Sequence, residues 1–130
     1  QGGRALRARL VGDLAGLAGG DPLRLAGQWE AWLKSREAAS AGLDMATLVS
    51  WFQRWVTDLA SVRLGGRVRF FPDQEGVLAA LAVSMSVASA SACYNSALAL
   101  RRVAQHPLNA RLMLEDMLIR YARAVHGGAS

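Results

Sequence analysis

Cysteine and lysine are almost missing from this chain of 130 residues, which has one of each, Cys93 and Lys34. A single cysteine excludes an internal disulfide and a zinc site built from several thiolates, and it fits a reducing compartment such as the cytoplasm. No glycine-rich G-x-x-x-x-G-K-[ST] loop surrounds Lys34, so the sequence has no phosphate-binding loop. Cys93 lies in a run of alanine and serine, where we expect a buried, inert thiol.

Groups that carry out catalysis are also scarce. The two histidines, His106 and His126, flank the last helical segment, and neither has a nucleophile or a carboxylate in a recognisable arrangement. Glu115 and Asp116 are adjacent, so on a helix their side chains diverge by roughly 100° and do not form a catalytic pair. We therefore expect no catalytic residue, no metal ligand and no cofactor. A small helical enzyme would need a polar pocket, of which the sequence gives no sign.

Charge is missing from a long stretch, because no Asp, Glu, Lys or Arg occurs from Gly76 to Leu100. Such a run raises the question of a membrane span, but its many serines, with Tyr94 and Asn95, interrupt the apolar residues. The sequence therefore predicts no membrane segment. Ser84-Met85-Ser86 predicts a helix break, followed by a second helix over about 87–106 that closely packed neighbours bury.

The rest of the chain is dominated by helical periodicity and its stop signals. Asp21-Pro22, Asp44 and Asp73 are predicted helix starts, and Gly19-Gly20 and Gly65-Gly66 are predicted ends. The helix that starts after Asp21 is predicted to continue, weakening, towards Gly42. These signals predict an all-α fold, a compact bundle of five to six helices formed by residues 1–130 as a single domain.

The clearest amphipathic helix is predicted to start after Asp44. Leu48, Trp51, Phe52, Trp55, Val56 and Leu59 lie on one stripe of that helix. Three aromatic rings on one stripe are compatible with a ligand pocket, but aromatic residues on a buried stripe commonly supply the area of a core. We therefore predict that Trp51 and Trp55 are core residues.

The formal net charge of +5 makes a nucleic-acid-binding module an alternative. Against it, fourteen of the fifteen basic residues are arginines that are mostly dispersed singly. Arg67 to Pro72 is the one stretch without helical periodicity, and its interleaved Arg and Phe residues could stack on bases. The favoured interpretation is a loop that tucks Phe70 or Phe71 under the bundle and leaves Arg67 and Arg69 in solvent.

The last helix is predicted to start after Pro107, with Asn109 as its cap. Its apolar residues cover more than one contact face, and charged residues lie between them: Arg111, Glu115, Asp116, Arg120 and Arg123. Such a helix needs partners on more than one side.

Residues Leu108 to Tyr121 resemble the end of the delta-prime subunit of the bacterial DNA polymerase III clamp loader. An asparagine, a basic residue, a leucine-rich run, an acidic pair and a final arginine occur in the family's order. Leu48 to Leu59 resembles the family's long helix, Gly65 to Asp73 its glycine-containing loop, and Ala97 to Arg102 its penultimate helix. The resemblance covers the chain from about Asp21 onward. Clamp-loader gamma/tau subunits share a related helix, so a gamma/tau collar is an alternative.

This resemblance implies a non-catalytic collar domain, a fragment of a longer cytoplasmic subunit of the DNA polymerase holoenzyme. Its partners would be the gamma/tau and delta subunits, joined with it in a ring. DNA and the sliding clamp would be contacted only indirectly, through N-terminal domains outside this chain. If the last helix faces a neighbouring subunit, the candidate interface residues are Arg111, Glu115, Arg120 and Arg123, for which a solvated face is the alternative.

Overall fold

A computed structural model of the chain describes residues 2–17, 20–104 and 110–126. Within these residues the secondary structure is helical, which confirms the all-α prediction, and seven α-helices occur where five to six were expected. They are α1 (Gly2–Gly16), α2 (Pro22–Leu33), α3 (Arg36–Ser40), α4 (Met45–Arg63), α5 (Glu75–Val83), α6 (Val87–Ala104) and α7 (Ala110–Val125), with a short 3-10 helix, η2 (Pro72–Gln74), before α5.

The extra helix arises at Ser35. The sequence predicted one helix running on towards Gly42, but α2 ends at Leu33 and α3 begins at Arg36. The Ser35 hydroxyl donates to the carbonyl of Trp32, 2.6 Å away, and accepts from the amide of Ala38 at 3.1 Å. Ser35 thus closes one helix and caps the next, because a serine side chain satisfies the free amides of a first turn. The single long helix was therefore a wrong prediction.

Other predicted helix ends are confirmed. The carboxylates of Asp21 and Asp44 accept hydrogen bonds from the amides of Leu23 and Thr47, at 3.0 and 2.8 Å. The predicted break at Ser84 to Ser86 separates α5 from α6, and Ser86 caps α6 through the amide of Ser89. The predicted break at Pro107 and cap at Asn109 lie outside the described residues.

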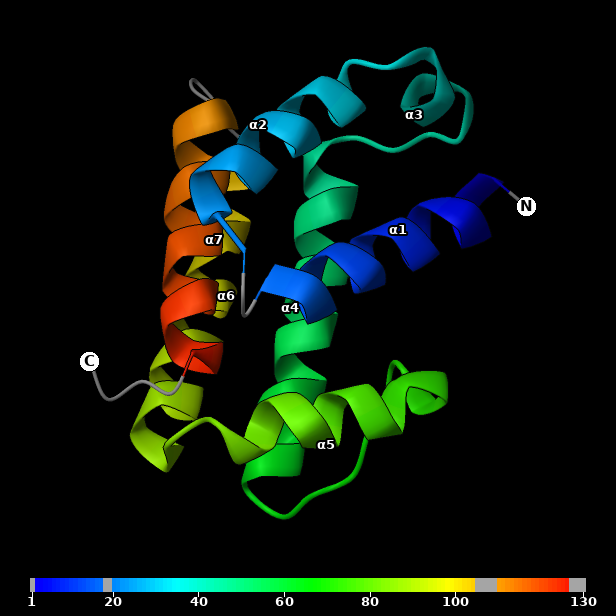
Figure 1. Ribbon diagram of the computed structural model, residues 1–130. Coiled ribbons are helices and arrows are strands. Elements are labelled where there is room, and N and C mark those ends of the chain that lie inside the picture. The colour runs from blue at the N-terminus through cyan, green and yellow to red at the C-terminus, as the bar shows by residue number, and fades with distance from the viewer. Residues whose placement is uncertain (1, 18–19, 105–109, 127–130) are drawn as a thin grey trace.

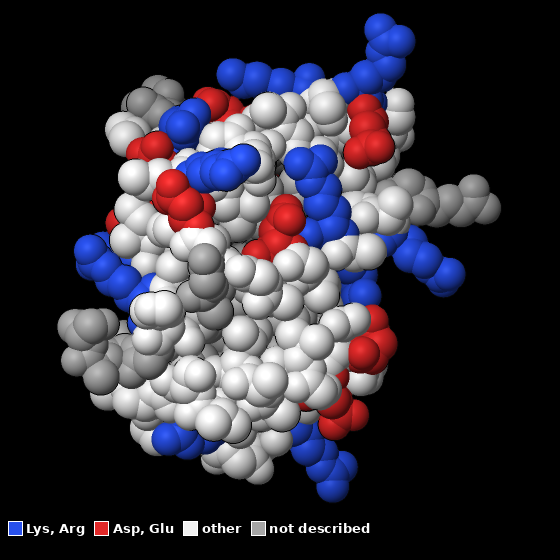
Figure 2. Space-filling view, viewed as in Figure 1, with Lys and Arg blue, Asp and Glu red and all other residues white. Residues whose placement is uncertain are grey.

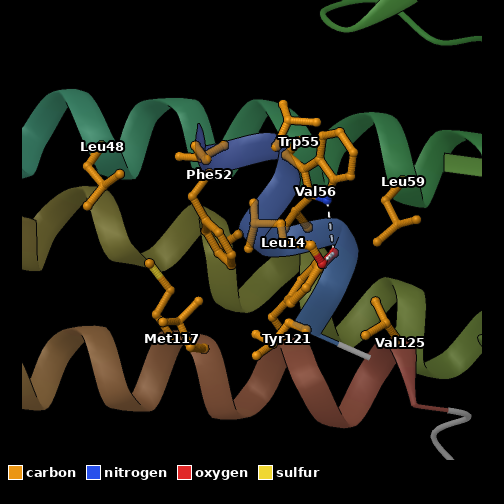
Figure 3. Close-up of a cluster of buried hydrophobic side chains, with 14 of the residues drawn as sticks. Leu14, Leu48, Phe52, Trp55, Val56, Leu59, Met117, Tyr121 and Val125 are labelled. Carbon is orange, nitrogen blue, oxygen red and sulfur yellow. Dashed lines mark hydrogen bonds between the residues drawn. The ribbon is translucent and has the colours of Figure 1, made fainter. Parts of the chain in front are cut away.

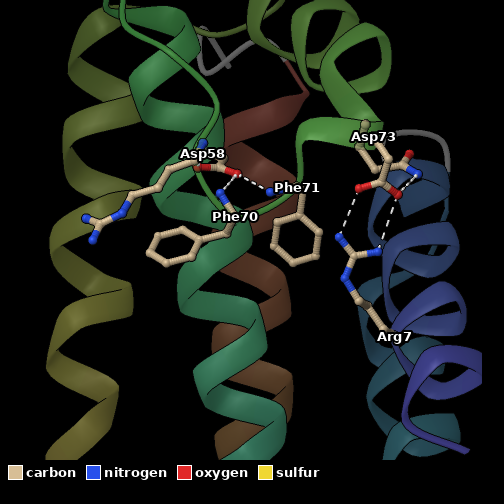
Figure 4. A network of polar contacts seen from close by, with 7 residues as sticks. Arg7, Asp58, Phe70, Phe71 and Asp73 are labelled. Carbon is tan, nitrogen blue, oxygen red and sulfur yellow. Dashed lines mark hydrogen bonds and ion pairs between the residues drawn. The ribbon is translucent and has the colours of Figure 1, made fainter. Parts of the chain in front are cut away.

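Asp73 has a different role from the predicted cap. The helix α5 starts at Glu75 after η2, without a capping side chain. The Asp73 carboxylate instead binds the guanidinium of Arg7 in α1, with a shortest distance of 3.0 Å (Figure 4). The cap prediction was wrong because a cation from another helix lies within reach of this side chain.

Helix α4 is the centre of the bundle, with α5 and α6 packed along it and α1 crossing it (Figure 1). Its apolar stripe meets Met117 and Tyr121 of α7 in one buried cluster (Figure 3). Trp55 is completely buried, which confirms its predicted place in the core. Trp51 is only half-buried, so the prediction for it was too strong: it packs at the margin of the core.

Three helices are joined by one buried tyrosine. The indole Nε1 of Trp55 donates to the Tyr121 hydroxyl at 2.9 Å, and that hydroxyl donates to the carbonyl of Leu14 at 3.0 Å. Burial raises the pKa of Tyr121 well above its usual value, so the group stays protonated and keeps its donor. The hydrogen bonds fix α1, α4 and α7 relative to one another, because a buried polar group is costly to leave without a partner.

The uncharged helix α6 is less buried than the sequence suggested. Of its residues from Val87 to Leu100, only Ala90, Cys93 and Ala97 are buried, while Ala92, Leu98 and others are exposed. The prediction of burial by close neighbours is therefore wrong for most of this helix. Absence of charge in α6 reflects an uncharged outer surface as well as a buried face. Among the described helices, none combines the length and apolarity that crossing a membrane requires.

Candidate subunit interface

Helix α7 lies between α2 on one side and α6 on the other (Figure 1). Its buried residues extend over a wide arc of the helix: Met113, Leu114, Met117, Leu118, Tyr121, Ala124 and Val125. The bundle itself therefore supplies the several partners that the broad apolar stripe required. The four predicted interface residues are left between these contacts, and the structure divides them into two pairs.

Arg111 and Glu115 belong to the contact between α7 and α2. The Arg111 guanidinium lies 3.1 Å from the Glu115 carboxylate and 3.3 Å from that of Glu30 in α2. It rests against Gly27, where a Cβ would come within 3.1 Å of its nitrogen. Glycine at position 27 thus lets the guanidinium lie on the α2 backbone. On the face that Figure 2 shows, basic and acidic residues interleave over its upper part, where α2 lies.

Arg120 and Arg123 lie on another face of α7. Arg120 pairs with Asp116, one turn earlier on the same helix, at 3.1 Å, and both side chains are exposed. Arg123 is exposed as well, and no acidic residue of the described part of the chain pairs with it. Exposed pairs of this kind stabilise a fold little, so these charges are available for other contacts.

Arg120 and Arg123 border a groove between α6 and α7, formed by two adjoining hollows. The first, of about 340 Å³, is lined by residues that include Phe52, Ser96, Leu100, Asp116, Met117 and Arg120. The second, of about 270 Å³, is lined by Ser89, Ala92, Cys93, Ser96, Arg120, Arg123 and Ala124. The pairing of lining residues shows that α6 and α7 run antiparallel. We call this feature the α6–α7 groove.

Small side chains create this groove. Ala92, Ser96 and Ala99 of α6 project too little to fill the space beside α7. Sequence reasoning missed these residues, because it assigned the alanine and serine run to close packing inside the bundle. It also missed Glu30, whose spacing from Arg111 no local pattern could reveal. Cys93 is buried at the groove wall as predicted, and burial raises the pKa of its thiol to about 11.

The segment from Arg67 to Phe71 has the predicted form. Phe71 is buried against Trp55, Phe70 is half-buried, and Arg67 and Arg69 are exposed. Arg54 and Arg69 both lie over the Phe70 ring, with 5.6 and 5.0 Å between guanidinium carbon and ring centroid. The chain's own arginines thus occupy the ring that a base would need for stacking, so this geometry does not favour the nucleic-acid alternative.

One buried carboxylate holds this segment in place. Asp58 of α4 is fully buried, and its oxygens accept hydrogen bonds of 2.8 Å from the amides of Arg69, Phe70 and Phe71 (Figure 4). Sequence reasoning missed this residue, although a charged residue between Trp55 and Leu59 on a buried stripe is a signal of such a role. Its role is to fix the loop.

Metal ligation finds no support in the part of the chain that is described, where no group of three or more His, Cys, Asp or Glu side chains is placed to hold an ion.

Comparison with known proteins gives one family. No curated protein and no solved structure matches the sequence. Residues 37–123 match the family described as DNA polymerase III, delta subunit, C terminal, a clamp-loader family. The match extends from α3 to Arg123 in α7 and so includes both walls of the α6–α7 groove. Because it covers more than half of the chain, the chain belongs to this family, the C-terminal domains of DNA polymerase III delta subunits.

Proposed function

We propose that this chain is the collar domain of a delta-prime subunit of the bacterial DNA polymerase III clamp loader. In this role it assembles its subunit with the gamma/tau and delta subunits in the cytoplasm and supports the loading of sliding clamps. The observation that carries the proposal is the family match over residues 37–123. The domain's own part is assembly, not chemistry.

Delta-prime, as distinct from delta, is favoured by the sequence at the end of the chain. The order of asparagine, arginine, leucine-rich run, acidic pair and arginine from Leu108 to Tyr121 resembles delta-prime. The family match also favours a delta-type subunit over gamma/tau. DNA and the clamp would be contacted by other parts of the protein.

Arg120 and Arg123 are the residues of α7 that we propose to contact a neighbouring subunit directly. Both are exposed, and their groups lie at the border of a groove. Arg111 and Glu115 are engaged with α2, so their proposed contribution to assembly is to hold the α7 surface in place. Part of the Arg111 side chain still reaches solvent, and it can add a peripheral contact.

The test is assembly with purified subunits. The chain is mixed with gamma/tau and delta subunits and passed through a size-exclusion column. We expect it to co-elute with them, and we expect full-length delta-prime, but not additional delta, to displace it. Displacement by delta alone would assign the chain to the delta position. Failure to co-elute under any condition would overturn the proposed function.

A separate measurement addresses the nucleic-acid alternative. Fluorescence anisotropy with single- and double-stranded oligonucleotides should detect no binding at physiological ionic strength. A DNA-binding module would instead show affinity that falls steeply as salt increases, because bound arginines displace counterions from phosphates.

A further inference from the structure

We propose that the α6–α7 groove receives a helix of a neighbouring clamp-loader subunit, with small or apolar side chains facing α6 and an acidic residue opposite Arg123. This inference rests on the proposed function and names the surface that carries it. The groove differs from the α2–α7 contact, where Arg111 is already paired with acidic residues of this chain.

The dimensions of the groove fit a helix. From Ser89 to Leu100 the lining residues follow α6 for eleven positions, which corresponds to roughly 16 Å or three helical turns. The antiparallel wall of α7, from Asp116 to Arg123, has a similar extent. A partner helix laid between these walls would fill the space that Ala92, Ser96 and Ala99 leave open.

The chemistry of the groove is that of an interface core. Its α6 wall carries no charge, and residues such as Phe52, Leu100 and Met117 contribute apolar surface. Protein interfaces are depleted of charge at their centre and polar at their rim. Alanine loses no side-chain entropy when it is covered, so burial of this wall by a partner carries a low ordering cost.

Charge identifies the kind of partner. The groove is bordered by one carboxylate, Asp116, and two guanidinium groups, Arg120 and Arg123. Asp116 is paired with Arg120, and within the described residues no carboxylate pairs with Arg123. The border is therefore net basic, and complementarity of potential favours a helix with acidic residues along its edge.

The experiment measures the affinity of labelled chain for the gamma/tau–delta mixture. Ala92→Trp and Ala99→Trp fill the groove from exposed positions, and Arg123→Glu reverses its unpaired charge. Controls are Ala79→Trp on the exposed side of α5 and Arg36→Glu at the start of α3, neither of which lines the groove. We expect each groove variant to weaken binding by at least roughly tenfold with unchanged melting temperature, and the controls to bind within about twofold of wild type.

The outcomes separate the inference from the proposed function. If wild-type chain binds and the groove variants bind equally well, the groove is not the interface and the inference is overturned. If wild-type chain does not bind at all, the proposed function fails. Analytical ultracentrifugation of the chain alone completes the test: a dimer that Ala92→Trp converts to monomer would make a second copy the occupant and would also overturn the inference.

Discussion

At the residue scale, Asp58 shows how one buried carboxylate determines the path of a loop. It accepts three amide hydrogen bonds from consecutive residues, Arg69 to Phe71, that follow α4 in the chain. Charge-assisted hydrogen bonds of this kind are stronger than neutral ones. They orient Phe71 into the core against Trp55.

Replacing Asp58 should therefore be costly. In Asp58→Ala the three amides lose their acceptor, and we expect the free energy of unfolding to fall by about 2–4 kcal/mol, since each unpaired buried donor costs on the order of 1–3 kcal/mol and water can reach part of the loop. Urea unfolding monitored by tryptophan fluorescence measures the change. Asp116→Ala, on the exposed face of α7, is the control and should change stability by less than about 0.5 kcal/mol. An equal effect of the two substitutions would contradict this account.

At the element scale, the position of α7 depends on contacts that differ between its two sides. Towards α2 it has a charged bridge built on a glycine, and towards α6 it has small residues and a groove. The same helix therefore serves the bundle with one side and leaves the other side open. This difference makes two arginines of one helix respond differently to charge reversal.

We expect Arg111→Glu to lower the free energy of unfolding by about 1–2 kcal/mol, because it removes two partly exposed ion pairs and places a third carboxylate beside Glu30 and Glu115. Arg120→Glu removes only the exposed pair with Asp116 and should cost roughly 0.5 kcal/mol or less. Thermal and urea unfolding of both variants, compared at equal ionic strength, provide the measurement. A larger loss in Arg120→Glu than in Arg111→Glu would show that the α2–α7 bridge is not a determinant of stability.

At the scale of the whole molecule, two aspartates link stability to pH. The hydrogen bond from Arg7, followed by that from Gln74, lowers the pKa of Asp73 from 3.8 to about 2. The hydrogen bonds of Thr47 lower the pKa of Asp44. A lowered pKa in the folded state means that the ionised carboxylate favours folding. This contribution is complete above the unfolded value near 3.8 and is lost as pH falls towards about 2.

We therefore expect the melting temperature of the wild type to fall between pH 4 and pH 2, as is ordinary when paired carboxylates are protonated, at roughly the values that the shifted pKa implies. The double variant Asp44→Asn with Asp73→Asn should show a smaller fall, because it has no carboxylate at these positions. Asparagine caps helices about as well as aspartate, so the cap at position 44 is retained. Calorimetry across this range checks the expectation, and a fall of the same size in both proteins would refute it.

The sequence by itself determined the fold class, most helix ends and the burial of the main aromatic residues. It could do so because these features depend on interactions within a few residues. Asp21 and Asp44 cap helices through amides two and three positions away. Trp55 and Leu59 share a face because a helix repeats every 3.6 residues. The family was also readable from the order of such segments, as the match over residues 37–123 shows.

Only the tertiary structure decided which surface of the helices is free and which side chains are engaged. Arg111 meets Glu30 and Arg7 meets Asp73 across long stretches of chain, and no local rule relates those positions. The uncharged run of α6 suits a buried helix and an interface wall equally well, since hydrophobicity does not specify what covers a surface. That choice depends on how much of α6 the helices α4 and α7 cover, and their packing leaves the groove open because small side chains cannot fill it.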